Sequence, residues 1–281
     1  MILTPQLKSL VKKTPLKTLY WWCLDLVRIL KPFRKSLDGF YFRGSAEMLS
    51  GTYEPLIREF VLSSNSDNHT LINIGANSGY YPCLAGSQHY KKIIAVEPDK
   101  TNFRIMKSNI EKNQFQSVSL INAACSSSVG VANLWGRNTG ASLVPDWEGN
   151  PPDNEARINT TTLDILFDLI PANDFVLSII DVEGFEYEVL KGAQGVLKSA
   201  RNITWIIEVS LWRNVKGESI LSPFLFDLFE LFRNSGYRPY KCDIGWPEID
   251  EAEVKKMIQG EIFWPAFPIL FKKDKKSEIK T

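Results

Sequence analysis

Residues 71–80, with the sequence LINIGANSGY, combine an apolar run with a loop that contains two glycines. The run is rich in β-branched residues, Gly75 and Gly79 follow it, and a helical pattern begins at Tyr80. Such a turn lets a ligand approach the backbone and meet unpaired N–H groups at the positive end of a helix. The segment is therefore predicted to be a strand, a ligand-binding loop and the start of a helix.

A second apolar run, residues 93–96, follows this loop and ends at Glu97. A carboxylate at the tip of the second strand can accept hydrogen bonds from two ribose hydroxyls. The dinucleotide fingerprint G-x-G-x-x-G is absent, because Ala76, Asn77 and Ser78 follow the first glycine, and no Gly-Lys-Ser/Thr phosphate loop is present. An adenosine ligand without phosphates is therefore the better candidate, and S-adenosylmethionine fits that description.

Acidic residues also follow two later apolar runs. Asp181 ends one run, with Glu183 and Glu186 close behind, and Glu208 ends the other. Ligands of open α/β sheets bind beyond the carboxyl ends of the strands, so these acids belong on the same rim as the glycine loop. Asp181, Glu183 and Glu208 are predicted to accept a proton, orient a hydroxyl or hold a divalent ion, with helix capping as the alternative. Glu186 is assigned to helix capping.

Composition and cysteine usage limit the class of protein. The chain has 281 residues, of which 44% are hydrophobic and 23% charged, and its net charge of +1 gives no general attraction to nucleic acid. Four scattered cysteines without a C-x-x-C pair or a secretory signal indicate reduced thiols in a cytoplasmic protein. No apolar run reaches the roughly 18 residues of a membrane span. The two histidines do not suggest a metal site, and no metal ligand is assigned.

Strand and helix patterns alternate from residue 71 onward, which predicts an α/β fold with a mainly parallel sheet. The predicted strands are 71–74, 93–96, 118–123, 176–180, 204–209, 237–242 and 262–271, with 129–135 as an extra edge strand. The predicted helices are 79–89, 100–113, 162–170, 185–199 and 221–234. The chain is divided into an N-terminal helical extension (1–62) and a ligand-binding domain (63–281).

The first 35 residues carry eight basic side chains and a single acid, Asp25, which gives this segment a charge of +7. Apolar residues recur at spacings of three and four between Leu16 and Leu30, which predicts an amphipathic helix. This helix could lie on an anionic membrane or pack against the core as a lid. Packing is favoured, because Asp25 and Arg28 lie beside the apolar stripe.

A long loop at 136–157 is rich in Gly, Pro, Asn and Asp and contains Ser142 and Trp147. Loops of this length are usually functional or disordered. We expect this one to serve as a lid or as a platform for the methyl acceptor.

Several motifs resemble those of the FkbM-type methyltransferases in order and spacing. They lie at 72–81, 97–99, Asn102, 122–124, 140–143, 162–164, 180–186 and 190–193, and 51–55 is similar to that family's lead-in. The resemblance covers roughly residues 50 to 210. It implies a Rossmann-like, seven-stranded methyltransferase sheet with helices on both faces and an antiparallel last strand. It also implies methyl transfer from S-adenosylmethionine to a hydroxyl on a sugar, glycan or secondary metabolite.

The loop, the strand tips and the resemblance together give a set of expected cofactor-binding residues. They are Asn73, Gly75, Ala76, Asn77, Gly79, Tyr80, Glu97, Pro98, Asn102, Ala123, Ala124 and Asp181. Two residues depart from the family pattern, which usually has Asp at Asn73 and Lys at Ile179. Asn73 can still bond an ammonium group, so cofactor binding is expected to be weakened and not lost.

Two other functions remain open. The first is a catalytically inactive S-adenosylmethionine-binding domain with a regulatory or scaffold role, in keeping with the two departures. The retained acids Asp181, Glu183, Glu186 and Glu208 argue against it. The second is an NAD-dependent oxidoreductase, and the missing glycine of the dinucleotide fingerprint argues against that.

Overall fold

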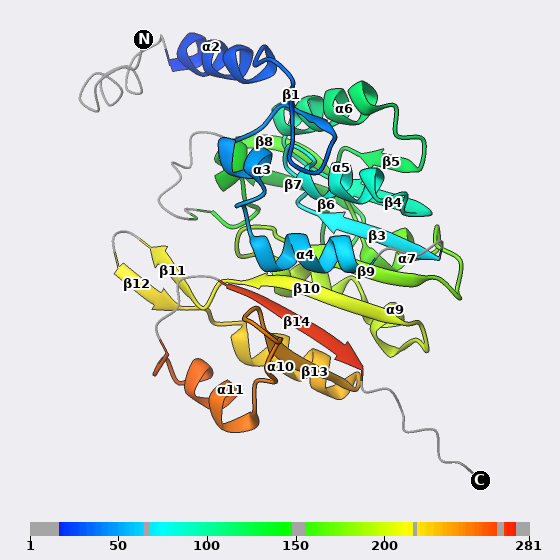
Figure 1. Ribbon diagram of the computed structural model, residues 1–281. Coiled ribbons are helices and arrows are strands. Elements are labelled where there is room, and N and C mark those ends of the chain that lie inside the picture. Colours follow the sequence, from blue (N-terminus) through cyan, green and yellow to red (C-terminus); the bar gives the residue numbers. More distant parts are fainter. Residues whose placement is uncertain are drawn as a thin grey trace.

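The computed structural model describes residues 17–64, 68–145, 147, 155–215, 218–262 and 267–273. Its central sheet consists of β3 (His69–Ile74), β4 (Lys92–Val96), β5 (Val118–Ile121), β9 (Phe175–Ile180), β10 (Ile203–Val209), β13 (Tyr237–Lys241) and β14 (Phe267–Lys273). The strands lie in the order β13-β14-β10-β9-β3-β4-β5 (Figure 1). Strands β5, β4, β3, β9 and β10 pair in parallel, and β14 is antiparallel to both of its neighbours. This order confirms the predicted Rossmann-like methyltransferase sheet.

Helices cover both faces of this sheet (Figure 1). One layer contains α4 (Pro55–Ser63), α5 (Tyr80–Ser87) and α6 (Lys100–Asn113), and the other contains α7 (Leu163–Phe167), α8 (Glu186–Lys191), α9 (Gln194–Lys198) and α10 (Leu225–Asn234). Side chains of a strand point alternately to the two faces. In β3, Leu71 therefore packs into the first layer, whereas Ile72 and Ile74 pack into the second. Since both faces are covered, nearly the whole of β3 is buried.

Some predicted boundaries were wrong. The predicted helix 185–199 is two helices, α8 and α9, which meet at Gly192. A Cβ at Gly192 would lie 2.2 Å from the carbonyl oxygen of Ser126, which accounts for a glycine at this position, and the Gly192 carbonyl accepts the N–H of Asp164 at 2.9 Å instead of a helical N–H. The predicted strand 118–123 ends at Ile121. The side-chain amide of the next residue, Asn122, donates a hydrogen bond to the backbone carbonyl of Glu97 at 2.8 Å. Helix α10 begins at Leu225, because the start of the predicted helix 221–234 belongs to a strand, β12 (Glu218–Leu221).

The predicted edge strand 129–135 is a strand but does not join the central sheet. It is β7 (Gly130–Trp135), which pairs with β8 (Glu155–Thr161) in a small sheet completed by β6 (Ala124–Cys125). Strand β8 takes up the end of the predicted 136–157 loop, of which residues 146 and 148–154 lie outside the described part. Further elements that the sequence reading missed are β1 (Arg34–Lys35), β2 (Tyr41–Phe42), α3 (Ala46–Ser50), β11 (Trp212–Val215), which pairs with β12, and α11 (Glu251–Ile258).

The N-terminal extension contains α2 (Lys17–Ile29), which lies against α6, while residues 1–16 are outside the described part. Asp25 on α2 forms an ion pair with Arg137 at 3.2 Å. Arg28 donates a hydrogen bond to the side-chain oxygen of Asn102 at 2.9 Å. The polar side chains of α2 therefore hold this helix on the core. The four cysteines are free thiols, and no helix of the described residues is long and apolar enough to cross a membrane.

Gly75, at the end of β3, adopts a φ of +78°, and a Cβ there would lie 1.7 Å from the carbonyl oxygen of Asp181. We expect Gly75→Ala to destabilise the fold by about 1–3 kcal/mol more than Gly236→Ala. Gly236 is the matched control, because its φ is +79° and a Cβ there would meet nothing within 4 Å. Urea unfolding of both variants measures the difference. Equal losses would contradict a steric role for the contact between Gly75 and Asp181.

Candidate active site

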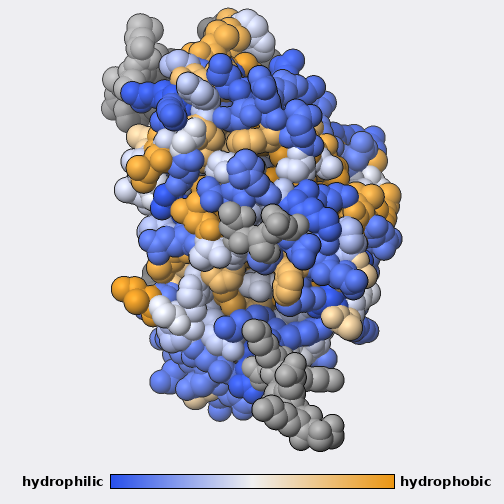
Figure 2. Space-filling view, turned by 45° about the vertical axis from the view of Figure 1, so that its right-hand side comes forward, coloured by the Kyte–Doolittle hydropathy of each residue, from blue (hydrophilic) through white to orange (hydrophobic). Residues whose placement is uncertain are grey.

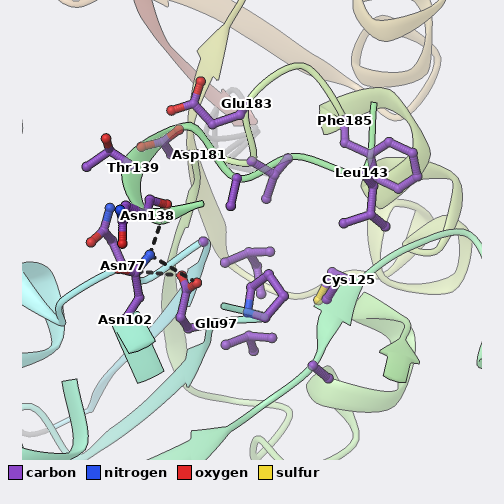
Figure 3. A pocket seen from close by; sticks show the side chains of 18 residues that line it. Asn77, Glu97, Asn102, Cys125, Asn138, Thr139, Leu143, Asp181, Glu183 and Phe185 are labelled. Atoms are coloured by element: carbon purple, nitrogen blue, oxygen red, sulfur yellow. Dashed lines mark hydrogen bonds between the residues drawn. The ribbon is translucent and has the colours of Figure 1, made fainter. Parts of the chain in front are cut away.

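A narrow cleft opens beyond the carboxyl ends of β3, β4 and β9 (Figure 3). Glu97 and Asn77 lie on one side of the cleft, and Leu143 and Phe185 lie on the other. Nine residues predicted from the sequence line it: Gly75, Asn77, Glu97, Pro98, Asn102, Ala123, Ala124, Asp181 and Glu183. The structure therefore brings together the ends of separate strands, as the sequence predicts.

Glu97 follows β4 and is 4% exposed. Its carboxylate accepts the backbone N–H groups of Asn77 and Asp99, both at 2.8 Å, and the side-chain amide of Asn102 at 3.4 Å. Burial raises the pKa of Glu97 to about 7, and the nearby charge of Asp99 adds to this effect. A carboxylate has about four acceptor sites, and these bonds use three of them, so Glu97 can hold the loop and still accept a ligand hydroxyl.

One part of the cleft wall is apolar and suits the face of a flat ring. Ile74, Val96, Ala123 and Ala124 are buried residues that line it, and none of them carries a polar side chain. Ligand pockets are commonly apolar with a few polar groups that fix orientation. One buried carboxylate beside small apolar side chains fits the adenosine part of S-adenosylmethionine.

A second cavity, of about 560 Å³, adjoins this cleft, and Gly75, Asn77, Thr139, Asp181 and Glu183 line both. Four more of the predicted residues line the second cavity: Asn73, Ala76, Tyr80 and Glu208. Gly79, which was predicted to bind the cofactor, lines neither the cleft nor the second cavity. Its N–H donates a hydrogen bond to the carbonyl of Ala76 at 2.8 Å, within the loop itself.

The two family departures both lie at this second cavity. Asn73 is 2% exposed, and its side-chain amide lies 3.4 Å from the carbonyl oxygen of Ile179. Ile179 is also buried, so its side chain gives the cavity wall an apolar surface where the family has a lysine. The basic charge that this position usually supplies to the acidic rim is therefore absent at Ile179.

The second cavity is rich in carboxylates that come from separate elements. Asp181 follows β9, Glu208 lies on β10, and Glu54 precedes α4. The Tyr81 hydroxyl donates a hydrogen bond to the Glu54 carboxylate. Within the described residues, no group of three or more metal-ligating side chains is placed to hold an ion. The acids are grouped around a space that a ligand could enter.

Burial and the charges of neighbouring carboxyls raise the pKa values of Asp181 and Glu54. Burial raises the pKa of Asp181 well above its usual range, and the neighbouring carboxyls of Glu208 and Glu183 raise it further. A hydrogen bond between Asp181 and Glu208 contributes in the same direction. The pKa of Glu54 is also raised, first by burial. Carboxyls with raised pKa values are stronger bases once ionised, as general bases near neutral pH must be.

Glu183 lies in a turn that the long loop holds in place. Its φ is +56°, and Gly184 follows at +88°. The Trp147 indole donates to the Glu183 carboxylate at 2.9 Å, and the Ser142 hydroxyl donates to the Glu183 carbonyl at 2.7 Å. Trp147 is only 5% exposed, and a Cβ on Gly184 would lie 2.1 Å from its ring. Trp147 is thus a packing residue here, and it does not present an open ring face for a sugar.

Glu186 has a structural role, as the sequence predicts. It is the first residue of α8, is 5% exposed, and accepts the N–H of Gly184 at 2.9 Å. Burial raises its pKa to about 7. Its carboxylate therefore fixes the turn that carries Glu183.

Several residues at the site were missed by sequence reasoning. Glu54 and Tyr81 line the second cavity, and both lie within segments that carry the family resemblance, which is the signal that could have found them. Arg28 was missed as well. Its guanidinium bonds Asn102 and the side chain of Asn138, and the Asn102 amide donates to the Asn138 carbonyl at 3.0 Å. Helix α2 therefore closes one rim of the cleft beside Glu97.

The profile of the Methyltransferase FkbM domain matches residues 73–239, which is more than half of the chain. The chain belongs to this family. Family membership confirms the predicted S-adenosylmethionine-dependent methyltransferase and its cofactor. No curated protein sequence matches the chain.

Solved structures with a similar fold are distant in sequence from this FkbM methyltransferase. Precorrin-6y C5,15-methyltransferase from Geobacter metallireducens GS-15 is 13% identical, with coverage of 82% of this chain and 93% of that one and a TM-score of 0.42. M. jannaschii TYW2 in complex with AdoMet is 12% identical, covers 86% of each chain and has a TM-score of 0.42. A human methyltransferase 10 domain containing protein is 14% identical, covers 82% and 83%, and has a TM-score of 0.39. These similarities concern the fold alone.

The pKa of about 7 at Glu97 gives S-adenosylmethionine binding a pH dependence. Ribose hydroxyls donate best to an ionised carboxylate, so binding should favour the deprotonated form. Affinity should rise about tenfold from about pH 6 to about pH 8, because the ionised fraction of Glu97 rises by that factor. In the absence of ligand, the raised pKa of Glu97 has the opposite effect on folding stability. The free energy of unfolding falls as pH rises from about 4.3, the pKa of a glutamate in the unfolded chain, to about 7.

Calorimetric titration of the wild type and of Glu97→Gln at several pH values measures this dependence. The variant should bind more weakly above neutral pH and should lose most of the pH dependence. Titration of the ligand's own amino group is common to both proteins, so their difference isolates Glu97. The ribose contact would lie elsewhere if both proteins gave the same affinity and the same pH profile.

Proposed function

We propose that this FkbM methyltransferase transfers the methyl group of S-adenosylmethionine to a hydroxyl oxygen on a sugar, glycan or secondary metabolite. The observation that carries the proposal is the pair of adjoining cavities, with Gly75, Asn77, Thr139, Asp181 and Glu183 lining both. The first would hold the cofactor through Glu97, and the second would hold the acceptor. A group that lines both cavities can contact the acceptor close to the transferred methyl.

The acceptor cavity has the chemistry of a polyhydroxyl site. The carboxylates of Glu54, Asp181 and Glu208 are hydrogen-bond acceptors for hydroxyl groups, and Tyr53 and Tyr81 add aromatic surface. The same carboxylates would repel phosphates, which supports an acceptor other than nucleic acid. This charge pattern is the reason to prefer an uncharged or basic small molecule or glycan.

The chemistry requires the acceptor oxygen to face the methyl carbon in line with the bond that breaks. Bound S-adenosylmethionine supplies an electrophilic methyl carbon on a positively charged sulfur. Transfer would form the new oxygen–carbon bond as the sulfur–carbon bond breaks, and the electron pair of the broken bond would stay on sulfur. The proton of the acceptor hydroxyl passes to the Asp181 carboxylate, while Glu183 and Glu208 orient the acceptor.

The inactive alternative has less support from the site. A regulatory domain has no use for partly buried carboxyls with strongly raised pKa values, and such groups cluster at catalytic sites. The departure at Asn73 leaves a polar amide at the cavity wall, which can still accept a hydrogen bond from an ammonium group.

The type of product tests the proposal. The protein is incubated with methyl-labelled S-adenosylmethionine and a panel of methyl glycosides and cell-derived glycans, and the labelled product is hydrolysed and identified by mass spectrometry. Label in methyl ethers of sugars or other hydroxyl compounds is expected. Label confined to nitrogen or carbon, or in RNA or protein, would contradict O-methylation, and binding without any transfer would favour the inactive domain.

Asp181→Asn should lower turnover by roughly a hundredfold or more with little change in melting temperature, because it removes a base and keeps the shape. Glu186→Gln is the matched control, since Glu186 is a carboxylate in the same segment that holds the backbone turn at Gly184. The control should keep its turnover. A variant that loses much of its stability but keeps its specific activity would contradict a catalytic role and indicate a structural role for Asp181.

A further inference from the structure

Helix α2 has two faces of different character, and its polar face is occupied by the core. Asp25 pairs with Arg137, and Arg28 bonds Asn102 and Asn138. The Arg137 guanidinium also lies 5.9 Å from the centre of the Trp21 ring. The orientation of α2 about its own axis is therefore fixed by bonds to the cleft rim.

The opposite face of α2 points away from the protein and is apolar. Its large side chains are widely exposed: Leu19 56%, Trp22 60%, Leu26 38%, Val27 61% and Leu30 68%. Their spacing of three and four residues places them in one stripe along the helix. Orange atoms gather at the top of Figure 2, where α2 lies. A helix that already holds the core by its polar face thus presents an apolar stripe outward.

Exposed basic side chains follow this stripe in sequence. Lys31, Arg34 and Lys35 follow α2 directly and are exposed, and the exposed Leu37 extends the apolar surface. The two acidic or basic side chains described within α2, Asp25 and Arg28, both lie on the core side, so none interrupts the stripe. An apolar stripe bordered by cations is the pattern of helices that lie in the interface of an anionic membrane.

We propose that this protein docks on anionic membrane surfaces through the outward stripe of α2, with Lys31, Arg34 and Lys35 at the lipid phosphates. Charge complementarity favours this occupant. Lipid phosphates would neutralise Lys31, Arg34 and Lys35, whereas the outward stripe of a second copy of α2 carries no acidic side chain among the described residues that could do so. The proposal does not depend on the identity of the methyl acceptor. Docking through α2 would keep the cleft rim, which Arg28 contacts, close to the membrane.

Vesicle co-sedimentation of the full chain tests the proposal. Vesicles of phosphatidylcholine with phosphatidylglycerol are compared with vesicles of phosphatidylcholine alone. The wild type should bind the anionic vesicles at least about tenfold more tightly than the neutral ones, and added salt should weaken this binding. The variant Trp22→Ser with Leu26→Ser should bind the anionic vesicles at least about tenfold more weakly, because it removes apolar contact area.

The matched control is Phe226→Ser with Ile244→Ser, which changes two other exposed apolar side chains, of 54% and 88% exposure, outside α2. This control should bind like the wild type, and thermal unfolding should show that both double variants are folded. Wild type that fails to bind anionic vesicles would overturn the proposal. So would an α2 variant that binds like the wild type, or a dimer that the α2 variant abolishes in the absence of vesicle binding.

Discussion

The site depends on the close approach of two neighbouring strand ends. The N–H of Asp181 donates to the carbonyl of Ile74 at 3.0 Å, and the next residue, Gly75, leaves no room for a Cβ beside the Asp181 carbonyl. The backbone therefore leaves β3 and enters the cofactor loop beside the end of β9, where Asp181 lies. Because this contact is between backbones, it fixes how far the acidic rim lies from the loop. The cofactor cleft and the acceptor cavity share a wall for this reason.

Two carboxylates with raised pKa values serve different purposes at this wall because their partners differ. Glu97 is buried but accepts two backbone N–H groups, so its hydrogen bonds offset part of the cost of burying its charge. Asp181 has carboxyl neighbours, and they raise its pKa beyond the effect of burial. The first arrangement suits a fixed acceptor for ligand hydroxyls, and the second suits a group that takes up a proton. The turn at Glu183 is held separately, by Trp147 and Ser142 from the long loop.

Local sequence patterns predicted the central sheet and most of the cleft. The β-branched runs before Gly75 and Glu97 are buried on both faces, so their pattern is strong, and Gly75 and Glu97 themselves mark the rim. Local sequence patterns could not predict the features that depend on contacts between segments far apart in the chain. Strand β7 pairs with β8 across a long loop, and Arg28 reaches Asn102, 74 residues away in sequence. At the break in 185–199, the Gly192 carbonyl likewise bonds a distant residue, the N–H of Asp164.

The central claim is that the cofactor lies between Glu97 and Asp181, with its methyl group directed toward the acceptor cavity. A crystal structure of the full chain with S-adenosylhomocysteine tests this claim most directly. The account predicts ribose hydroxyls within hydrogen-bonding distance of the Glu97 carboxylate. It also predicts that the sulfur faces the space lined by Asp181, Glu208 and Glu54. A ribose bound away from Glu97, or a sulfur that faces away from these carboxylates, would contradict it.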